Sequence, residues 1–350
     1  MEEKASKITN EYLLSLLDKA FENKKIEEIV NYLNVAKGTI LRWKKLKKVP
    51  KQYIFDLLKI NNINIDYSNY SFQDKDQYYT PIDTALECFN IFKKILNNFN
   101  ENIKDYVFIE PSAGNGNFLK VLPKNTLAFD IEPKNNDSIK KQDYLNWYPH
   151  DNVKRIAFGN PPFGLRGHLA LKFINHSYDF CDYVCFILPQ FFESDGKGTP
   201  RKRVKKYNLI YSGKINQKFL DPKGNEIKIN CIFQIWSKYH KNDKYIMNKK
   251  KIKNIKVLSL SNEKTPSTKR NVKMLHKCDI YLPSTCFGKN NMRYYESFND
   301  LPNNKGYGII FKEKKNDNIE KFKNIDWSSI AFLSTNSAYN IRTSMITSLF

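Results

Sequence analysis

"YVFIEPSAGNGNF", residues 106–118, joins a short apolar run to a turn that contains two glycines. An apolar run of this length, rich in β-branched and aromatic side chains, predicts a strand over 106–110. Gly114 and Gly116 permit a tight turn and a close approach of the backbone to a ligand, although an ordinary tight turn would also use them. The stretch therefore predicts a strand that ends at a candidate ligand-binding loop.

The pattern of apolar runs continues on both sides of this stretch. Further strands are predicted for "TLAFD" (126–130), "RIAFG" (155–159) and "YVCFIL" (183–188), and helical patterns cover 84–96 and 167–178. Strands that alternate with helices predict an α/β fold with a parallel sheet and helices on both faces. Two more apolar runs, separated by "DPKGNE", predict a hairpin that ends the sheet, namely 209–215 and 227–239.

Composition points to a polyanionic partner. The 350 residues have a formal net charge of +22, and 41% of them are hydrophobic, which excludes wholesale disorder. A surplus of positive charge of this size predicts nucleic acid as the partner, and a membrane surface is the second candidate. A lysine-rich surface that is merely solvated is the alternative.

Targeting and metal signals are missing from the sequence. Residues 1–20 lack the apolar core of a signal peptide, and no apolar run approaches the ~20 residues of a membrane span. Six scattered cysteines form no CxxC pair, and five histidines show no ligand-like spacing. We expect a cytoplasmic, DNA-associated protein of bacterial or viral origin, with no metal and no membrane partner.

Residues 1–66 predict a small all-α region. An amphipathic helix, a turn at "NVAKG" (34–38) and a second helix with "TILRWKKLKK" (39–48) resemble a helix-turn-helix DNA-binding unit. Seven Lys or Arg and no acid lie between Val30 and Phe55. The second helix is therefore a candidate groove reader, with Arg42 and Lys44 as DNA contacts. A packing or dimerisation module with a solvated basic face is the alternative.

Polar residues follow the predicted strands at one edge of the sheet, where open α/β sheets bind ligands. Asp130 ends the run 126–130 and could accept both hydroxyls of a ribose. Asp143 follows at the next end, and Asn160 begins the "NPPFG" of 160–164. Two prolines in a row lack N–H groups and have fixed φ angles, so this loop is stiff.

Five motifs stand in one order: "QYYTP" (77–81), "FIEPSAGNGNF" (108–118), "FDIEP" (129–133), "QDYL" (142–145) and "GNPPFG" (159–164). In this order they resemble the S-adenosylmethionine-dependent amino-methyltransferases of DNA, in the subgroup that modifies adenine N6. The resemblance covers about residues 77–240. It implies a Rossmann-like class I methyltransferase sheet and S-adenosyl-L-methionine as cofactor.

The resemblance also implies a cofactor site. Thr80 would hold the methionine moiety, Glu110 and the backbone from Ser112 to Gly116 its amino acid part, and Asp130 the ribose. Ile131 would pack on the adenine ring of the cofactor, and Asp143 would accept a hydrogen bond from the amino group of that ring. The complete set of implied cofactor residues is Tyr79, Thr80, Pro81, Glu110, Ser112, Gly114, Gly116, Asp130, Ile131, Asp143 and Asn160.

The catalytic residues implied are Asn160, Pro161, Pro162 and Phe163. An exocyclic adenine amine is a poor nucleophile because its lone pair is delocalised into the ring. Two acceptors, the side-chain oxygen of Asn160 and the carbonyl of Pro161, would favour its pyramidal form, and the prolines would hold them rigidly. Phe163 would stack on a base flipped from the duplex. Phe233 is a candidate for the base's other face, with simple core packing as the alternative.

A basic loop follows the strand over 183–188. Eight Lys or Arg and no acid lie between Gly196 and Leu220, which predicts a phosphate clamp with Arg201, Lys202 and Arg203. A solvated loop is the alternative. The C-terminal third has no chemical motif, and its 278–295 stretch, with Lys289 and Arg293, is a candidate DNA-facing surface by position alone.

Together these features predict four segments. They are a helix-turn-helix-like domain (1–66), a linker (67–76), a catalytic domain (77–243) and an α+β target-recognition region (244–350).

The predicted activity is that of an adenine-specific DNA methyltransferase acting on a specific double-stranded sequence, in restriction–modification or alone. A cognate restriction endonuclease is a conceivable partner. The alternatives are methyl transfer to cytosine N4, an RNA base or protein glutamine, and a non-catalytic DNA-binding regulator on the same scaffold.

Overall fold

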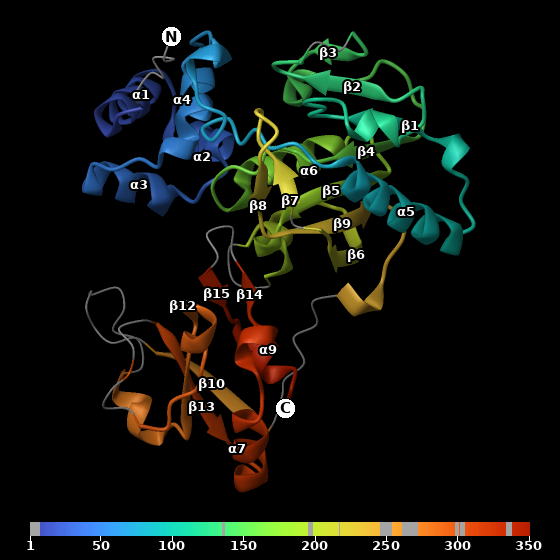
Figure 1. The fold of residues 1–350 in the computed structure, drawn as a ribbon. Helices are drawn as coiled ribbons and strands as arrows, with labels where there is room; N and C mark the ends of the chain where they lie inside the picture. Colours follow the sequence, from blue (N-terminus) through green and yellow to red (C-terminus); the bar gives the residue numbers. More distant parts are fainter. Residues whose placement is uncertain are drawn as a thin grey trace. The chain divides into compact units, whose positions relative to one another are not determined.

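The structure is a computed structural model that describes residues 8–134, 137–194, 199–216, 218–245, 254–260, 272–297, 301, 305–333 and 338–350. The chain divides into two compact units (Figure 1). We call them the sheet unit, Met1–Leu188 with Val204–Asn242, and the C-terminal unit, Pro189–Arg203 with Asp243–Phe350. In the described part of the chain, no helix combines the length and the apolar character that a bilayer crossing requires.

The sheet unit begins with short helices that pack around their own apolar core. The Thr9 side chain caps the first helix by accepting the Tyr12 N–H, and Leu17, Ile29 and Leu57 are completely buried. Asn34 ends the second helix in the left-handed conformation, with φ 53°. The helices are α1 (Asn10–Asn23), α2 (Ile26–Leu33), α3 (Lys37–Leu46) and α4 (Ile54–Ile60). The predicted helix, turn and helix are present, and their DNA-binding role stays a prediction.

The central sheet has, among the described residues, seven strands in the order β3-β2-β1-β4-β5-β9-β6 (Figure 1). Parallel pairing joins β1 to β2 and β4, β2 to β3, and β4 to β5. The order reverses between β1 and β4, which is the switch point where open α/β sheets bind ligands. The strands are β1 (Val107–Glu110), β2 (Leu127–Asp130), β3 (Ile139–Lys141), β4 (Arg155–Gly159), β5 (Tyr183–Pro189), β6 (Asn208–Lys214) and β9 (Cys231–Ser237).

Among the described residues, two helices are seen to pack on this sheet. On α5 (Ile82–Asn98), the Phe92 ring lies 6.2 Å from Phe108 of β1 and 5.9 Å from Phe158 of β4. On α6 (His168–Ser177), the Phe173 ring stacks at 5.5 Å on Tyr144, which follows β3. The predicted α/β architecture with a largely parallel sheet is therefore confirmed. Short β3 is the strand that the apolar runs did not predict, because only Ile139 of its three residues is buried.

The predicted terminal hairpin is present as the antiparallel pair β6–β9. Its connection contains a second hairpin, β7 (Lys218–Leu220) with β8 (Glu226–Lys228), around a turn in which Asp221 accepts backbone N–H groups of Lys223 and Asn225, each at 2.8 Å. Leu220 exchanges two backbone hydrogen bonds with Tyr79, at 2.7 and 2.8 Å. The small hairpin thereby fixes the "QYYTP" segment ahead of α5.

The predicted linker, residues 67–76, is a packed segment. The rings of Tyr67 and Tyr70 lie 5.2 and 4.8 Å from Phe55 of α4. The Asp76 carboxylate accepts the Gly164 N–H at 2.7 Å. The sequence predicted a linker because the stretch is polar, but the stretch also contains aromatic residues. Each of these must cover its apolar ring, so the segment packs instead of spanning two domains. The N-terminal helices and the sheet consequently belong to one compact unit.

The C-terminal unit contains two three-stranded sheets among its described residues, in the orders β10-β13-β11 and β12-β15-β14. Its strands are β10 (Ile255–Leu260), β11 (Ile280–Pro283), β12 (Thr285–Phe287), β13 (Gly306–Phe311), β14 (Phe332–Leu333) and β15 (Ala338–Asn340). Its helices are α7 (Lys315–Lys323), α8 (Trp327–Ile330) and α9 (Thr343–Thr347). Trp327 and Phe322 lie at the centre of its core, with rings 4.3 Å apart.

The segment Pro189–Arg203 belongs to this C-terminal unit and not to the predicted catalytic domain. Gln190 accepts the Leu333 N–H at 3.1 Å, and Arg342 donates to the Ser194 hydroxyl at 3.0 Å. These contacts join residues about 145 positions apart, which the sequence pattern could not reveal. Parts of the basic loop (196–198 and 217) lie outside the described residues.

Candidate functional site

A cavity of about 820 Å³, including its open mouth, lies at the carboxyl ends of β1, β2, β3 and β4. The segment from Lys75 to Thr80 forms another part of its wall. Its position is the one expected for a ligand site at the switch point of the sheet. Of the predicted site residues, the cavity is lined by Tyr79, Thr80, Ser112, Gly114, Asp130, Ile131, Asp143, Asn160 and Pro162.

The glycine turn after β1 is shaped by its neighbours. Gly114 has φ +54°, and a Cβ there would lie 2.9 Å from the Tyr79 ring. Its N–H donates to Asp130 Oδ2 at 2.8 Å, and the Gly116 N–H donates to the Ala113 carbonyl at 2.8 Å. Gly114 therefore allows both the turn and the close approach of the backbone to the cavity wall.

Asp130 ends β2 in a half-buried position in the cavity wall. Its two oxygens accept the N–H groups of Gly114 and Glu132, each at 2.8 Å. Burial nevertheless raises the pKa of this carboxyl. Each carboxylate oxygen has two lone pairs, so two acceptor positions remain for a ligand's hydroxyl groups. Ile131 follows with 37% of its surface exposed and adds an apolar patch to the wall.

Glu110, the last residue of β1, is completely buried. The Ser112 N–H lies 3.4 Å from its Oε1, and its Oε2 has no hydrogen-bond partner among the described residues. Burial raises the pKa of this carboxyl well above its ordinary value. A buried acid that is only partly satisfied costs stability, which a ligand with N–H donors would offset.

Asn160 follows β4 and completes this group of incompletely paired polar atoms. Its Oδ1 is buried and has no hydrogen-bond partner within the part of the chain described here. Its Nδ2 lies 3.5 Å from the Tyr78 carbonyl, and its own carbonyl accepts the Ser112 hydroxyl at 3.1 Å. The nearby Thr80 Oγ1 is also buried without a partner in the described residues. Donors from a ligand are the natural partners of such atoms.

The loop 160–164 is held from outside by residues that sequence reasoning missed. Asp76 accepts the Gly164 N–H, and burial raises the pKa of the Asp76 carboxyl. A Cβ on Gly164 would lie 2.4 Å from the His168 ring, so this ring and the loop are in close contact. His168 in turn bonds to Asp56 of α4 at 2.9 Å. No motif marks these residues, because they act through contacts between distant segments.

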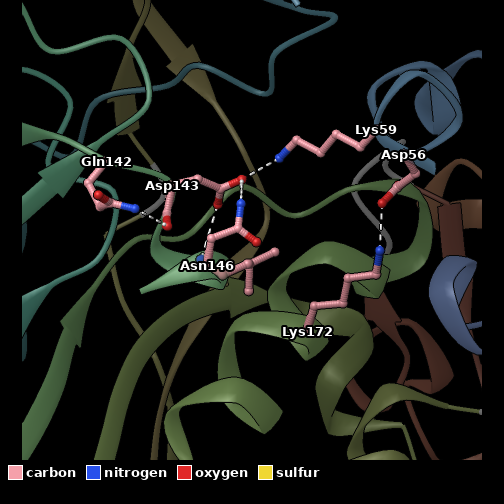
Figure 2. A network of polar contacts seen from close by, with 7 residues as sticks. Asp56, Lys59, Gln142, Asp143, Asn146 and Lys172 are labelled. Carbon is pink, nitrogen blue, oxygen red and sulfur yellow. Dashed lines mark hydrogen bonds and ion pairs between the residues drawn. The ribbon is translucent and has the colours of Figure 1, made fainter. Parts of the chain in front are cut away.

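Asp143 follows β3, lines the cavity and belongs to a network of polar contacts (Figure 2). Its Oδ1 accepts the Leu145 N–H at 3.1 Å, and its Oδ2 accepts from Lys59 of α4 at 2.6 Å. A second ion pair links α4 to α6, between Asp56 and Lys172 at 2.5 Å. Lys59 was not expected at the site, since the sequence placed it in a separate DNA-binding domain.

Two aromatic candidates occupy other places than expected. Phe233 is completely buried in the main core, 5.6 Å from the Phe158 ring and 6.3 Å from the Tyr211 ring. This burial favours the core-packing alternative, and the contact with a base stays a prediction. Phe163 is half-buried and packs on the same core, outside the residues that line the cavity. Pro161 is buried, and Pro81 and Gly116 also lie outside the lining set.

The predicted DNA contacts lie on two separate parts of the chain. Arg42 is exposed on α3, whereas Lys44 on the same helix pairs with Asp18 at 3.1 Å and lies 4.2 Å from the Phe21 ring. Arg201, Lys202 and Arg203 belong to the C-terminal unit, where Arg201 donates to the Tyr245 carbonyl at 2.7 Å. Arg201 is therefore already engaged within its own unit.

No protein-family model matches the sequence, and no curated protein matches it significantly. Among solved structures, one assigned as an RNA methyltransferase of Pyrococcus horikoshii is similar at 16% identity and a TM-score of 0.33, over 46% of this chain and 86% of that one. One assigned as a hemolysin of Streptococcus thermophilus reaches 13% and 0.30, over 45% and 68%. A type I restriction–modification structure reaches 11% and 0.32, over 67% and 61%. Similarity at this level is too low to assign a family or an activity.

Proposed function

We propose that this protein transfers a methyl group from S-adenosylmethionine to the N6 amine of a flipped-out adenine in double-stranded DNA. The observation that carries the proposal is the buried Asn160 Oδ1, an acceptor without a partner among the described residues, in a stiff Asn-Pro-Pro turn at the wall of the cavity. An amine donor from a substrate is what such an atom lacks.

The polar groups of the cavity fit the proposed cofactor. Thr80 of the lining and the buried Glu110, which lies outside the lining residues, would supply oxygens for the amino acid end. Asp130 has free lone pairs for ribose hydroxyls, and Asp143 and apolar Ile131 line the same cavity for an aminopurine. When bound, S-adenosylmethionine supplies an electrophilic methyl group on a sulfonium.

The turn at Asn160 would activate the acceptor amine. An exocyclic amine gains nucleophilicity when two acceptors hold its N–H bonds and localise its lone pair. We assign these roles to Asn160 Oδ1 and the Pro161 carbonyl, both held by prolines that need little reorganisation. No base need act first, because the proton can leave after the methyl group has been transferred.

Charge favours nucleic acid as the acceptor. The net charge of +22 and the basic α3 suit a polyanion, and a base must leave the helical stack to reach a cavity of this kind. The "NPPF" sequence, with Asn rather than Ser or Thr before the prolines, resembles the adenine subgroup. These features support DNA adenine over cytosine N4, RNA or protein glutamine.

The proposal is tested by offering the purified protein methyl-labelled S-adenosylmethionine together with unmodified plasmid, total RNA or protein. Nucleoside analysis of the plasmid is expected to reveal N6-methyladenine. If the label is found in cytosine, RNA or protein instead, the labelled molecule is the acceptor and the proposal for adenine N6 is wrong. Cofactor binding without transfer to any of them would favour the non-catalytic DNA-binding alternative.

A further inference from the structure

An N-terminal helix reaches the wall of the candidate cofactor site. Lys59 extends from α4 to Asp143 Oδ2, with 2.6 Å between nitrogen and oxygen (Figure 2). Asp143 lies 84 positions further along the chain and lines the cavity. The side chains of Lys59 and Asp143 are 32% and 21% exposed, so the pair is largely shielded from water.

The ion pair leaves Asp143 able to accept another donor. A carboxylate offers about four acceptor positions. Leu145 N–H uses one on Oδ1, Lys59 uses one on Oδ2, and the Asn146 amide lies at a long 3.5 Å from Oδ2. Lys59 therefore fixes the carboxylate without saturating it.

The helix that carries Lys59 is itself anchored. Asp56, one turn earlier on α4, bonds to His168 at 2.9 Å and to Lys172 at 2.5 Å, both on α6. Its side chain is only 11% exposed. Burial opposes the charge of Lys59, but Asp143, together with Tyr67 and Tyr32, more than offsets this, so that the pKa of Lys59 is raised. The ammonium is thus charged, and it is held at a fixed place beside the site.

We infer that Lys59 is a positioning residue that orients the Asp143 carboxylate toward the adenine amino group of the cofactor. The N-terminal helices then form part of the cofactor site as well as a candidate DNA-binding surface. This inference rests on the proposed function, because it takes the proposed cofactor as the ligand of the cavity.

Binding of two product analogues tests the inference without any methyl acceptor. S-adenosylhomocysteine carries the amino group, and its inosine counterpart carries an oxo group at the same position. Calorimetry on the full chain is expected to show a preference of roughly tenfold or more for the first, as a charge-assisted hydrogen bond predicts. In Lys59→Met this preference should fall at least about threefold, because the Asp143 carboxylate is no longer held.

Three further variants separate positioning from general damage. Lys37→Met removes another ion pair of the N-terminal helices, the one with Glu27 at 3.0 Å, which takes no part in anchoring α4, and should keep the preference. Lys59→Arg retains the charge and should restore it. In an Asp143→Asn background, Lys59→Met should change the preference no further, as required if Lys59 acts through Asp143. A thermal unfolding scan of each variant checks that it is folded.

Two results would count against the inference in distinguishable ways. If the wild-type protein binds both analogues and Lys59→Met leaves their ratio unchanged, or weakens both equally, the inference is wrong while the proposed function stands. If the wild-type protein binds neither analogue, the proposed function fails and the inference fails with it.

Discussion

Two glutamates at opposite ends of β1 have opposite surroundings. Glu101 lies near its amino end and accepts hydrogen bonds from the hydroxyls of Tyr106 and Tyr183 and from His240. Glu110 ends the strand and keeps one oxygen without a partner among the described residues. Burial opposes ionisation of both. At Glu101 its hydrogen bonds prevail and lower the pKa, whereas at Glu110 burial prevails and raises it.

The difference separates a structural polar cluster from a ligand site. The polar groups of the Glu101 cluster are hydrogen-bonded to one another, and the His240 ring also stacks on Phe99 at 3.9 Å. The carboxyl end of the sheet carries incompletely paired atoms on Glu110, Thr80 and Asn160. A folded chain tolerates buried polar atoms of this kind where a ligand completes them. The carboxyl end is therefore the candidate binding end, whereas Glu101 near the amino end of β1 is paired within the chain.

The largest expected effect concerns Asn160. Asn160→Ala should lower the methyl-transfer rate by roughly 10²–10³-fold, because one of two acceptors of the amine is lost. Calorimetric binding of S-adenosylhomocysteine should persist. Loss of cofactor binding to the same extent as activity would show that Asn160 belongs to the cofactor site and not to the acceptor site.

Gly159→Ala should disturb the fold at the ligand end. Its Cβ would lie 2.1 Å from Glu110 Oε1, and overpacking of this kind costs roughly 1–3 kcal/mol in unfolding free energy. Gly38→Ala is the control, since no atom lies within 4 Å of the added Cβ in α3, and it should be neutral or stabilising by up to about 1 kcal/mol. Equal stability of both variants in urea titrations would contradict the packing described.

The two glutamates should respond oppositely to amide substitution. The pKa of Glu110 is raised in the folded protein, so above about pH 4.3 the Glu110 carboxyl loses its proton more readily in the unfolded chain than in the folded one. The free energy of unfolding therefore falls as the pH rises. Glu110→Gln should remove this loss, because an amide does not titrate. The unfolding free energy of the variant should therefore exceed that of the parent protein by an amount that grows from pH 5 to pH 8. No growth with pH would contradict the assigned state of Glu110.

Glu101→Gln should instead destabilise the protein by roughly 1–3 kcal/mol at neutral pH, because charge-assisted hydrogen bonds are weakened. The lowered pKa of Glu101 gives a stabilisation that is present above about pH 4.3 and lost as pH falls through the folded-state pKa. The difference from the parent should therefore shrink in acid. Denaturant titrations between pH 3 and pH 7 measure it.

The smallest effect is expected at Tyr183. Tyr183→Phe deletes one hydrogen bond of 2.9 Å to Glu101 and should cost about 0.5–1.5 kcal/mol, since two partners of the carboxylate remain. Methyl transfer should be unchanged, because the change lies at the amino end of the strands. A loss of activity larger than the loss of stability would show that the two ends are coupled.

Local sequence predicted much of the sheet. The runs at 106–110, 126–130, 155–159 and 183–188 correspond to β1, β2, β4 and β5, because the buried strands of a parallel sheet are almost continuously apolar. The sequence could not separate the two roles weighed for Phe233, because a strand residue next to a motif region has the same pattern in a core as in a site. Lys59, Asp76 and His168 left no signal, since their contacts span many residues.

The sequence by itself determined which polar residues stand at the strand ends, because the chain order of strand and motif is a local property. Only the tertiary structure decided which of them lack partners, which are satisfied, and that the N-terminal helices contribute to the wall. Burial and pairing depend on segments such as α4 and β3, and α4 is brought to Asp143 by packing of the whole unit. That packing leaves buried oxygens of Glu110 and Asn160 without partners among the described residues, and it pairs the charge of Lys59 with Asp143.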